Sequence, residues 1–198
     1  MFTGIIQNLG EIIKFSDGEM EISTLLDLSD CKVGSSISCN GVCLTVTEIN
    51  RIDKNFLFKV NLGEETQNRT NFSADIFNYL IKINIEKSLK IGEEISGHFV
   101  YGHIDRTTKV SKIDNLKNSW EFYFENFQNE DSRFIVEKAS ICINGISLTI
   151  AKVDNNFFSI SIIPHTFENT NLKFLKLNDI VNVEFDYLAR FSKRAFVK

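Results

Sequence analysis

A cysteine and a serine occupy matching places in two copies of one short motif. Cys43 lies in SISCNGVCLTV at residues 36–46, and Ser147 lies in SICINGISLTI at residues 140–150. A thiol reaches its thiolate far more readily than a hydroxyl reaches its alkoxide. We therefore expect Cys43 to act as a nucleophile or as a polarising group, although a buried cysteine is also a small apolar residue. Ser147 has no base beside it in the sequence, so we expect it to orient or stabilise an adduct.

His103 is the candidate general base. It lies in the segment GHFVYGHID at residues 97–105, and a neutral imidazole with a pKa of about 6.5 accepts a proton near neutral pH. The alternative is a histidine hydrogen-bonded for structural reasons at the end of a strand. Thr45 and Thr149 alternate with apolar neighbours, which predicts that their hydroxyls share one strand face, in a pocket or in solvent.

Composition and charge exclude several classes of protein. The 198 residues are 43% hydrophobic and 24% charged, which is typical of a folded protein. The net charge of −4 includes no basic stripe, so we expect no nucleic-acid partner. We also expect no membrane span, because no apolar run approaches the ~18 residues needed to cross a bilayer. The four cysteines form no C-x-x-C pair, which favours reduced thiols, no metal site and a cytoplasmic location.

The elements that must position these residues are mainly strands. Runs rich in Ile, Val, Thr and Phe are separated by short turns, and Asn40-Gly41 is the dipeptide that most strongly indicates a tight hairpin. Phe56–Leu62 and Phe157–Ile163 are predicted strands, and short helical turns are predicted after Glu64 and after His165. This pattern favours a small antiparallel barrel or sandwich in each half.

The repeat extends along the chain. ETQNRTN at residues 65–71 matches HTFENTN at residues 165–171, and INIE at residues 83–86 matches VNVE at residues 181–184. Thr3-Gly4 aligns with Ser96-Gly97. We therefore predict an all-β protein with two tandem, homologous domains at residues 1–94 and 95–186, followed by a C-terminal helix at residues 187–198. Each domain is large enough to form a hydrophobic core of its own.

The tail pattern predicts an amphipathic helix. Leu188, Phe191, Ala195 and Phe196 recur at helical spacing. Such a helix packs against another subunit or back onto its own barrel, and the sequence leaves both open. Asp186 stands just before it and is a favoured helix N-cap residue.

Four motifs together resemble one family. MFTGII, NGVCLTV, GHFVYGHID and NGISLT occur in this order and in register with the repeat, and they closely resemble riboflavin synthase over essentially the whole chain. The resemblance implies two six-stranded Greek-key β-barrels, a homotrimer assembled through the C-terminal helix, and active sites between the N-terminal barrel of one subunit and the C-terminal barrel of its neighbour. It implies that two molecules of 6,7-dimethyl-8-ribityllumazine react by four-carbon transfer. The products are riboflavin and 5-amino-6-(D-ribitylamino)uracil, and no metal or organic cofactor takes part.

The resemblance also implies which residues act. The catalytic set carried over from the family is Phe2, Cys43, His103, Ser147, Thr149 and Asp186, with His103 working beside Thr149. The substrate contacts implied for the first barrel are Gly4, Ile5, Ile6, Ser36, Cys43, Leu44, Thr45, Asn61, Leu62, Gly63, Glu64, Glu65 and Thr66. Those implied for the second barrel are Gly102, His103, Ile104, Lys138, Ile146, Ser147, Leu148, Ile160, Ser161, Ile162, Ile163, Pro164 and His165.

One departure and one rival function remain. The family reads Pro-Glu-Thr in its second barrel, where this chain has Pro164-His165-Thr166, which puts the ribityl contact there in doubt. The rival is a lumazine or flavin carrier that shares the duplicated barrels without catalysis. A carrier is expected to lose polar groups in one pocket, whereas this chain keeps Cys43, His103, Ser147, Thr149 and Asp186 together. A purely structural β-protein leaves the matched motifs without a cause.

Overall fold

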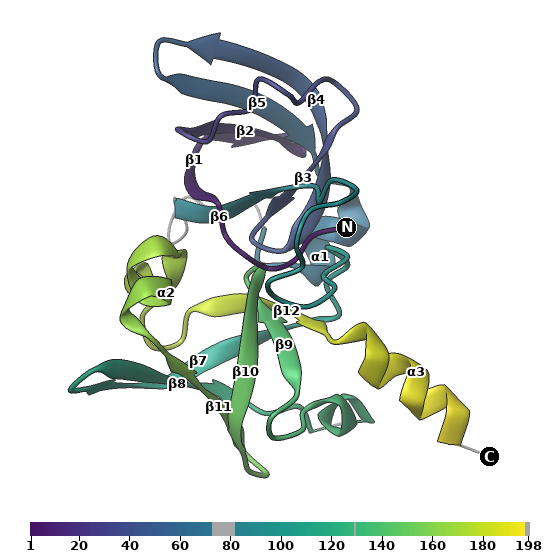
Figure 1. Cartoon of the computed structure of the whole chain (residues 1–198), viewed down its shortest axis with the longest axis vertical. Coiled ribbons are helices and arrows are strands. Elements are labelled where there is room, and N and C mark those ends of the chain that lie inside the picture. The colour runs from purple at the N-terminus through teal and green to yellow at the C-terminus, as the bar shows by residue number, and fades with distance from the viewer. Residues whose placement is uncertain (73–81, 129, 197–198) are drawn as a thin grey trace.

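Two closed β-barrels lie end to end and account for nearly all of the fold (Figure 1). The structure is a computed structural model that describes residues 1–72, 82–128 and 130–196. The first barrel consists of β1 (Asn8–Ser16), β2 (Glu19–Thr24), β3 (Ser36–Cys39), β4 (Val42–Ile52), β5 (Asn55–Asn61) and β6 (Lys82–Lys87). The second consists of β7 (Arg106–Leu116), β8 (Ser119–Glu125), β9 (Ser140–Ile143), β10 (Ile146–Val153), β11 (Phe157–Ile162) and β12 (Ile180–Phe185). The predicted all-β class and duplication are confirmed.

Both barrels have the same strand connectivity. In the first, β1 pairs with β2 and β6, and β3 pairs with β4 and β6, so that the last strand closes the barrel between the first and the third. In the second, β12 closes the barrel between β7 and β9 in the same way. The domain limits at residues 94 and 95 stay a prediction.

Strand alternation decides which side chains face the solvent. Along β4, Val42, Leu44 and Val46 are buried in the first core, while Cys43 and Thr45 point outward. Successive side chains in a strand point to opposite faces, so Cys43 and Thr45, like Ser147 and Thr149 of the second motif, lie on the outside of their barrels. These outward-facing side chains can contact neighbouring elements of the chain, whereas the interior of each barrel is filled by its hydrophobic core.

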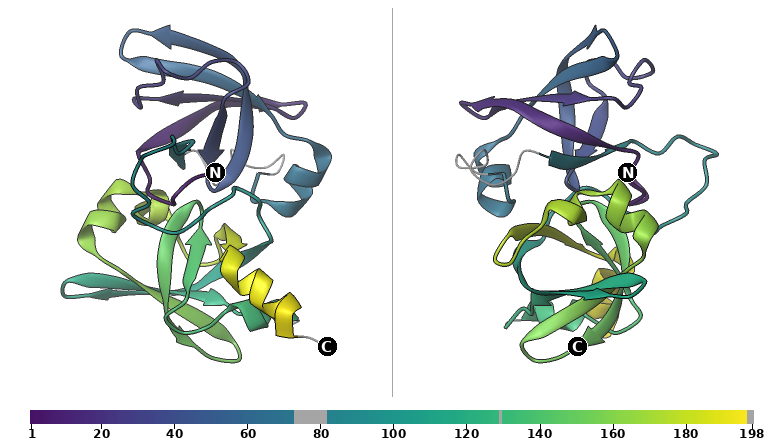
Figure 2. Two further views of the ribbon diagram at one scale, coloured as in Figure 1. Left: turned by 45° about the vertical axis from the view of Figure 1, so that its right-hand side comes forward. Right: turned by 90° about the vertical axis from the view of Figure 1, so that its left-hand side faces the viewer.

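Short helices flank the barrels. α1 (Glu64–Arg69) and α2 (Pro164–Asn169) occupy equivalent places after β5 and β11, as the sequence predicts. The 3-10 helices η2 (Glu130–Phe134) and η3 (Asn171–Phe174) belong to the second half. α3 (Tyr187–Phe196) follows β12 and extends from the second barrel toward the C-terminus (Figure 1 and Figure 2).

The two Asn-Gly turns meet at the junction of the barrels. Asn40 and Asn144 both have a φ of 46°, and the following Gly41 and Gly145 have φ values of 81° and 82°, as a tight hairpin turn requires. A Cβ built on Gly41 would lie 2.7 Å from the backbone nitrogen of Gly145, and the converse distance is also 2.7 Å. The repeated glycines therefore also allow the two barrels to touch.

Buried asparagine side chains join the barrels around these turns. Asn84 of β6 donates to the carbonyl oxygen of Asn144 at 2.9 Å, and Asn182 of β12 donates to that of Asn40 at 3.0 Å. Asn84 also donates to the side-chain oxygen of Asn171 at 2.9 Å. Buried amides that satisfy one another fix orientation as well as contact, so the network sets how the barrels face each other.

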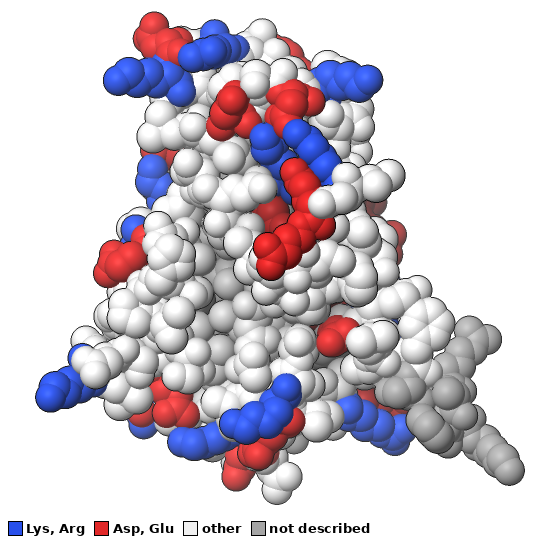
Figure 3. All heavy atoms as spheres, in the orientation of Figure 1, with Lys and Arg blue, Asp and Glu red and all other residues white. Residues whose placement is uncertain are grey.

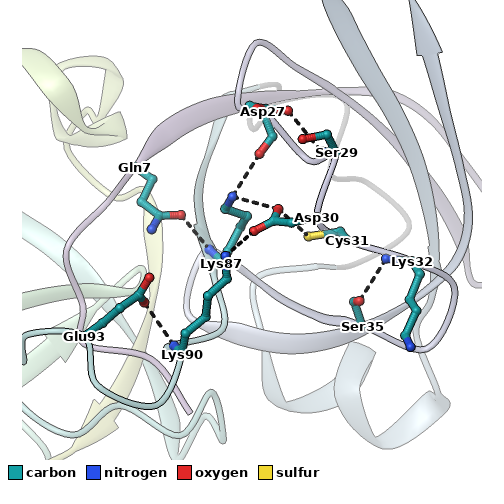
Figure 4. Close-up of polar contacts among 10 residues, drawn as sticks. All are labelled: Gln7, Asp27, Ser29, Asp30, Cys31, Lys32, Ser35, Lys87, Lys90 and Glu93. Carbon is teal, nitrogen blue, oxygen red and sulfur yellow. Dashed lines mark hydrogen bonds and ion pairs between the residues drawn. The ribbon is translucent and has the colours of Figure 1, made fainter.

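Charged groups hold the linker between the barrels to the first one (Figure 4). Lys87 donates to Asp30 at 2.9 Å and Lys90 donates to the same carboxylate at 2.5 Å. The hydrogen bonds from Lys90 and Lys87 hold the pKa of Asp30 well below its usual range. On the face drawn in Figure 3 such opposite charges lie beside one another rather than in single-sign patches.

Candidate active site

Cys43 lies beside a segment that comes from the other half of the chain. Its backbone N–H donates to the carbonyl oxygen of Gly102 at 2.9 Å. Gly102 has a φ of 81°, and a Cβ on it would lie 2.5 Å from that of Cys43. Residues 101–105, which lead into β7 of the second barrel, therefore form one wall around the first barrel's thiol. Gly102, His103 and Ile104 were assigned to the second barrel from the family pattern, but they lie against the first.

An open cleft of 360 Å³ adjoins Cys43. Its walls come from β4, from α1, from residues 102–105 and from α3, and the polar groups among them are Cys43, Glu65, Thr66, Arg69, Thr70, His103, Asp105 and Arg190. Arg190 of α3 pairs with Asp105. Burial raises the pKa of Asp105, while the hydrogen bond from the Phe185 N–H and the charge of Arg190 lower it.

Ser147 is surrounded in the same manner by the start of the chain. Its backbone N–H donates to the carbonyl oxygen of Gly4 at 2.8 Å, and a Cβ on Gly4 would lie 2.6 Å from the Ser147 nitrogen. Gly4 thus corresponds to Gly102, and the alignment of Thr3-Gly4 with Ser96-Gly97 is wrong. The true counterpart is Tyr101-Gly102, since both glycines face the outward residue of the other barrel's motif.

Ser147 also has a base, which the sequence analysis missed. The Nδ1 atom of His98 lies 2.7 Å from Ser147 Oγ. Burial lowers the pKa of His98 from its usual 6.5, and the charge of Asp186 offsets part of that effect. A neutral imidazole whose Nδ1 carries no proton accepts the hydroxyl proton at this distance. The signal was the first histidine of GHFVYGHID, but nothing in the sequence linked it to a serine 49 residues away.

A second cleft lies between the start of the first half and the helices α2 and η3 of the second half. It has a volume of 350 Å³ and is lined by Ile6, Gln7, Asn8, Leu9, His165, Glu168, Asn169 and Lys173. Ile6 takes the place that Ile104 has in the first cleft, and His165 the place of Glu65. Asn169 donates to the carbonyl oxygen of His165 at 2.8 Å. The duplication has therefore produced two related clefts with different polar walls.

Four other residues singled out from the sequence lie outside the two clefts. Phe2 is fully buried and pairs through its backbone with Val100. Thr45 and Thr149 are exposed on the outer faces of β4 and β10. Asp186 caps α3, because its side chain accepts the Leu188 N–H at 2.9 Å. The structural alternative for Asp186 is thus present, together with its electrostatic effect on His98.

The predicted substrate contacts fall into two groups. The side chains that point into the cores, and so offer only their backbone outside, are Leu44, Leu62, Ile146, Ile160 and Ile162. Exposed or half-buried positions are Ile5, Ile6, Ser36, Asn61, Gly63, Glu64, Glu65, Thr66, Lys138, Leu148, Ser161, Ile163, Pro164 and His165. Lys138 has a φ of 68° in the loop before β9, and its N–H donates to Ile150 at 2.9 Å.

Known proteins share both the sequence and the fold. The family model for the lumazine binding domain matches residues 3–88 and 101–186. Riboflavin synthase of Buchnera aphidicola subsp. Baizongia pistaciae is 36% identical over 97% of this chain and 90% of the relative. Riboflavin synthase of Escherichia coli (strain K12) is 34% identical over 94% of this chain and 87% of the relative. Riboflavin synthase of Saccharomyces cerevisiae (strain ATCC 204508 / S288c) is 36% identical over 98% of this chain and 85% of the relative.

Solved structures agree on the fold. LumP crystallised with riboflavin superposes with a TM-score of 0.77 at 24% identity, covering 93% of this chain and 99% of that one. LumP with 6,7-dimethyl-8-(1'-D-ribityl) lumazine gives a TM-score of 0.74 at 23% identity, covering 93% and 98%. Sequence identity over nearly the full length, two matches to one domain model and two barrels of one connectivity lead to the same assignment. The chain belongs to the riboflavin synthase family and carries the lumazine binding domain twice.

Proposed function

We propose that this protein converts two molecules of 6,7-dimethyl-8-ribityllumazine into riboflavin and 5-amino-6-(D-ribitylamino)uracil. The observation that supports this most strongly is that the duplication gives Cys43 and Ser147 equivalent surroundings: each donates its backbone N–H to a glycine of a segment from the other half of the chain, Gly102 and Gly4 respectively. Two identical substrates need two similar pockets, and unequal roles for the substrates need a difference between them. Cys43 and Ser147 supply that difference.

The reaction requires proton transfer and a fixed orientation of the two substrate molecules. The reaction needs a carbanion at the C7 methyl group of one lumazine and addition of a nucleophile at C7. The two products together hold all the atoms of the two substrates, so the dismutation consumes no other reagent. Holding two reactants in a reactive geometry supplies several kcal/mol, on the order of 7–11 at best.

The side chains have the properties that these steps require. His98 accepts the Ser147 proton and so allows the hydroxyl to stabilise or form an adduct. His103 is exposed beside the cleft at Cys43 and is free to move a substrate proton. Cys43 is half-buried on the same wall, where it adds to C7 or polarises the ring.

We further propose that the protein acts as a homotrimer in the cytoplasm. Leu188 and Phe191 on α3 are 71% and 59% exposed, and apolar side chains gathered on one helix are a common contact between subunits. The side chains of Ala195 and Phe196, which complete the predicted pattern, lie outside the described part of the chain. No helix among the described residues is long and apolar enough to cross a membrane. Free cysteines suit a reducing compartment.

The test is direct. The purified protein is incubated with 6,7-dimethyl-8-ribityllumazine alone, and the formation of riboflavin is followed by absorbance. Chromatography then identifies both products, and we expect riboflavin and the pyrimidine product in equal amounts. We expect turnover without any added reagent. Tight binding without product would support the carrier function and overturn the proposal.

A further inference from the structure

Two buried glutamates have no role in the chemistry described above. Glu86 on β6 and Glu184 on β12 occupy equivalent strands, and each is only 3% exposed. A buried carboxylate is costly unless hydrogen bonds satisfy it. In both cases the partners are backbone N–H groups of a segment that reaches across to the other barrel. We call residues 2–6 the N-terminal arm and residues 101–105 the central arm.

Glu184 binds three consecutive N–H groups of the central arm. Its Oε1 accepts from Tyr101 at 2.7 Å, and its Oε2 accepts from Gly102 at 2.8 Å and from His103 at 3.0 Å. The next contact of this arm is the bond from the Cys43 N–H to the Gly102 carbonyl oxygen at 2.9 Å. A carboxylate of the second barrel thus sets the position of His103 beside the thiol of the first.

Glu86 does the same for the N-terminal arm. It accepts from the Thr3 N–H at 2.7 Å, from the Thr3 hydroxyl at 2.9 Å and from the Gly4 N–H at 3.0 Å. The carbonyl oxygen of Gly4 then accepts the Ser147 N–H at 2.8 Å. A carboxylate of the first barrel therefore holds the arm that lies against the hydroxyl of the second.

We propose that Glu184 and Glu86 are crossed positioning residues, each of which holds the arm that forms the catalytic pocket of the opposite barrel. The inference rests on the proposed function for its kinetic consequence, but its structural part can be tested without turnover. It differs from a local structural role in one respect. Replacing Glu184 must change the surroundings of Cys43 in the first barrel, and replacing Glu86 must change those of Ser147 in the second.

The clamp requires Glu184 and Glu86 to be ionised. Burial raises the pKa of Glu184 to about 7, while the three N–H groups of the arm lower it. Burial also raises the pKa of Glu86, against the bonds from Thr3 and Gly4. Only the anion accepts at both oxygens, since a protonated carboxyl presents a donor to the arm.

Replacement by glutamine is the sharpest change. Glu184→Gln and Glu86→Gln keep the size of the side chain, but the new NH₂ group faces an N–H donor of the arm and repels it. Each variant is the matched control for the other, because the two glutamates have the same burial and equivalent strands. The background carries Cys31→Ser, since Cys31 and Cys43 are half-buried while Cys39 and Cys142 are buried.

The experiment measures hydrogen exchange at the Cys43 and Ser147 amides by nuclear magnetic resonance, together with alkylation of Cys43 by iodoacetamide. We expect Glu184→Gln to reduce protection of the Cys43 amide and to speed alkylation, each by about tenfold, with Ser147 unchanged. Glu86→Gln should do the converse and leave alkylation within a factor of about two. In the turnover assay both should lower kcat by on the order of tenfold to hundredfold, with a smaller effect on KM.

Two results would overturn the inference. One is that Glu184→Gln reduces protection at the Ser147 amide and Glu86→Gln reduces it at the Cys43 amide. The other is that neither variant changes the exchange of either amide. If Glu184→Gln does not fold, wild-type exchange at Tyr101, Gly102 and His103 decides. Amides that exchange as fast as those of the exposed residues 91–96 would exclude a clamp, whereas strong protection supports it. Absence of riboflavin production alone would refute the proposed function but leave these exchange results intact.

Discussion

At the scale of single residues, the ionisation of His98 decides what Ser147 can do. Burial lowers the pKa of His98 and Asp186 raises it. A lowered pKa keeps the ring neutral at pH 7, and the neutral form is lost only as the pH falls through that lower value. We expect the His98 ring to titrate below 6.5, measured by nuclear magnetic resonance and assigned with His98→Gln.

The variant Asp186→Asn provides a matched test, because asparagine caps a helix as well as aspartate does. Removing the negative charge should lower the His98 pKa further while α3 remains helical by circular dichroism. A rise in that pKa, or a titration of wild-type His98 above 6.5, would show that burial does not dominate at this site.

The exchange of Cys43 for serine tests the inequality of the two pockets. If the thiol adds to the ring or polarises it, Cys43→Ser should lower kcat by about a hundredfold or more, because serine does not ionise near neutral pH. Loss of the base in His103→Gln should be of similar size. Steady-state formation of riboflavin measures both, and Cys31→Ser is the control, since Cys31 lies outside the cleft at Cys43. Wild-type turnover in Cys43→Ser would remove the thiol from the mechanism.

At this scale the sequence revealed the nucleophiles but not their neighbours. Cys43 and Ser147 stand out because a repeated motif differs at one chemically meaningful position. His98 does not stand out, since its contact with Ser147 depends on how the segment before Val100 packs against β10. Spacing along the chain predicts which residues share an element, but not which elements touch.

At the scale of elements, the Asn-Gly turns have two separate requirements. Gly41 needs a positive φ, and it also needs space, because a Cβ would lie 2.7 Å from the backbone of Gly145. Gly34 has a φ of 91° but no atom within 4 Å of its Cβ position. Gly34→Ala should therefore cost only about 1 kcal/mol of unfolding free energy.

Gly41→Ala should cost clearly more, about 3 kcal/mol, since the backbone of the other turn must also move. Urea unfolding followed by circular dichroism gives both values. Equal losses in the two variants would mean that the barrels separate at little cost. The sequence predicted the hairpin from Asn40-Gly41, yet the contact between the two turns could not be read from it, because each turn was interpreted within its own half.

At the scale of the whole molecule, the repeat creates a chain whose halves complete one another. The central arm lies on the first barrel and the N-terminal arm on the second, while the asparagines at the junction fix their relative orientation. The sequence predicted two barrels but assigned each arm to its own barrel. Arms that cross explain why the residues around Cys43 come from both halves, and why one barrel alone should hold an incomplete pocket.

Assembly through α3 adds a further prediction at this scale. Arg190 of α3 pairs with Asp105 on the wall of the Cys43 cleft, so displacement of the helix should alter that wall. We expect the unchanged protein to sediment as the proposed trimer, and Leu188→Ser with Phe191→Ser to give monomers in sedimentation velocity and to lower kcat. The barrels should keep their circular dichroism spectrum, because both side chains are exposed in the single chain. Leu25→Ser is the control, since Leu25 is 63% exposed on the first barrel. A double variant that stays trimeric would place the contact between subunits elsewhere, and one that is monomeric yet fully active would show that each chain forms a complete site by itself.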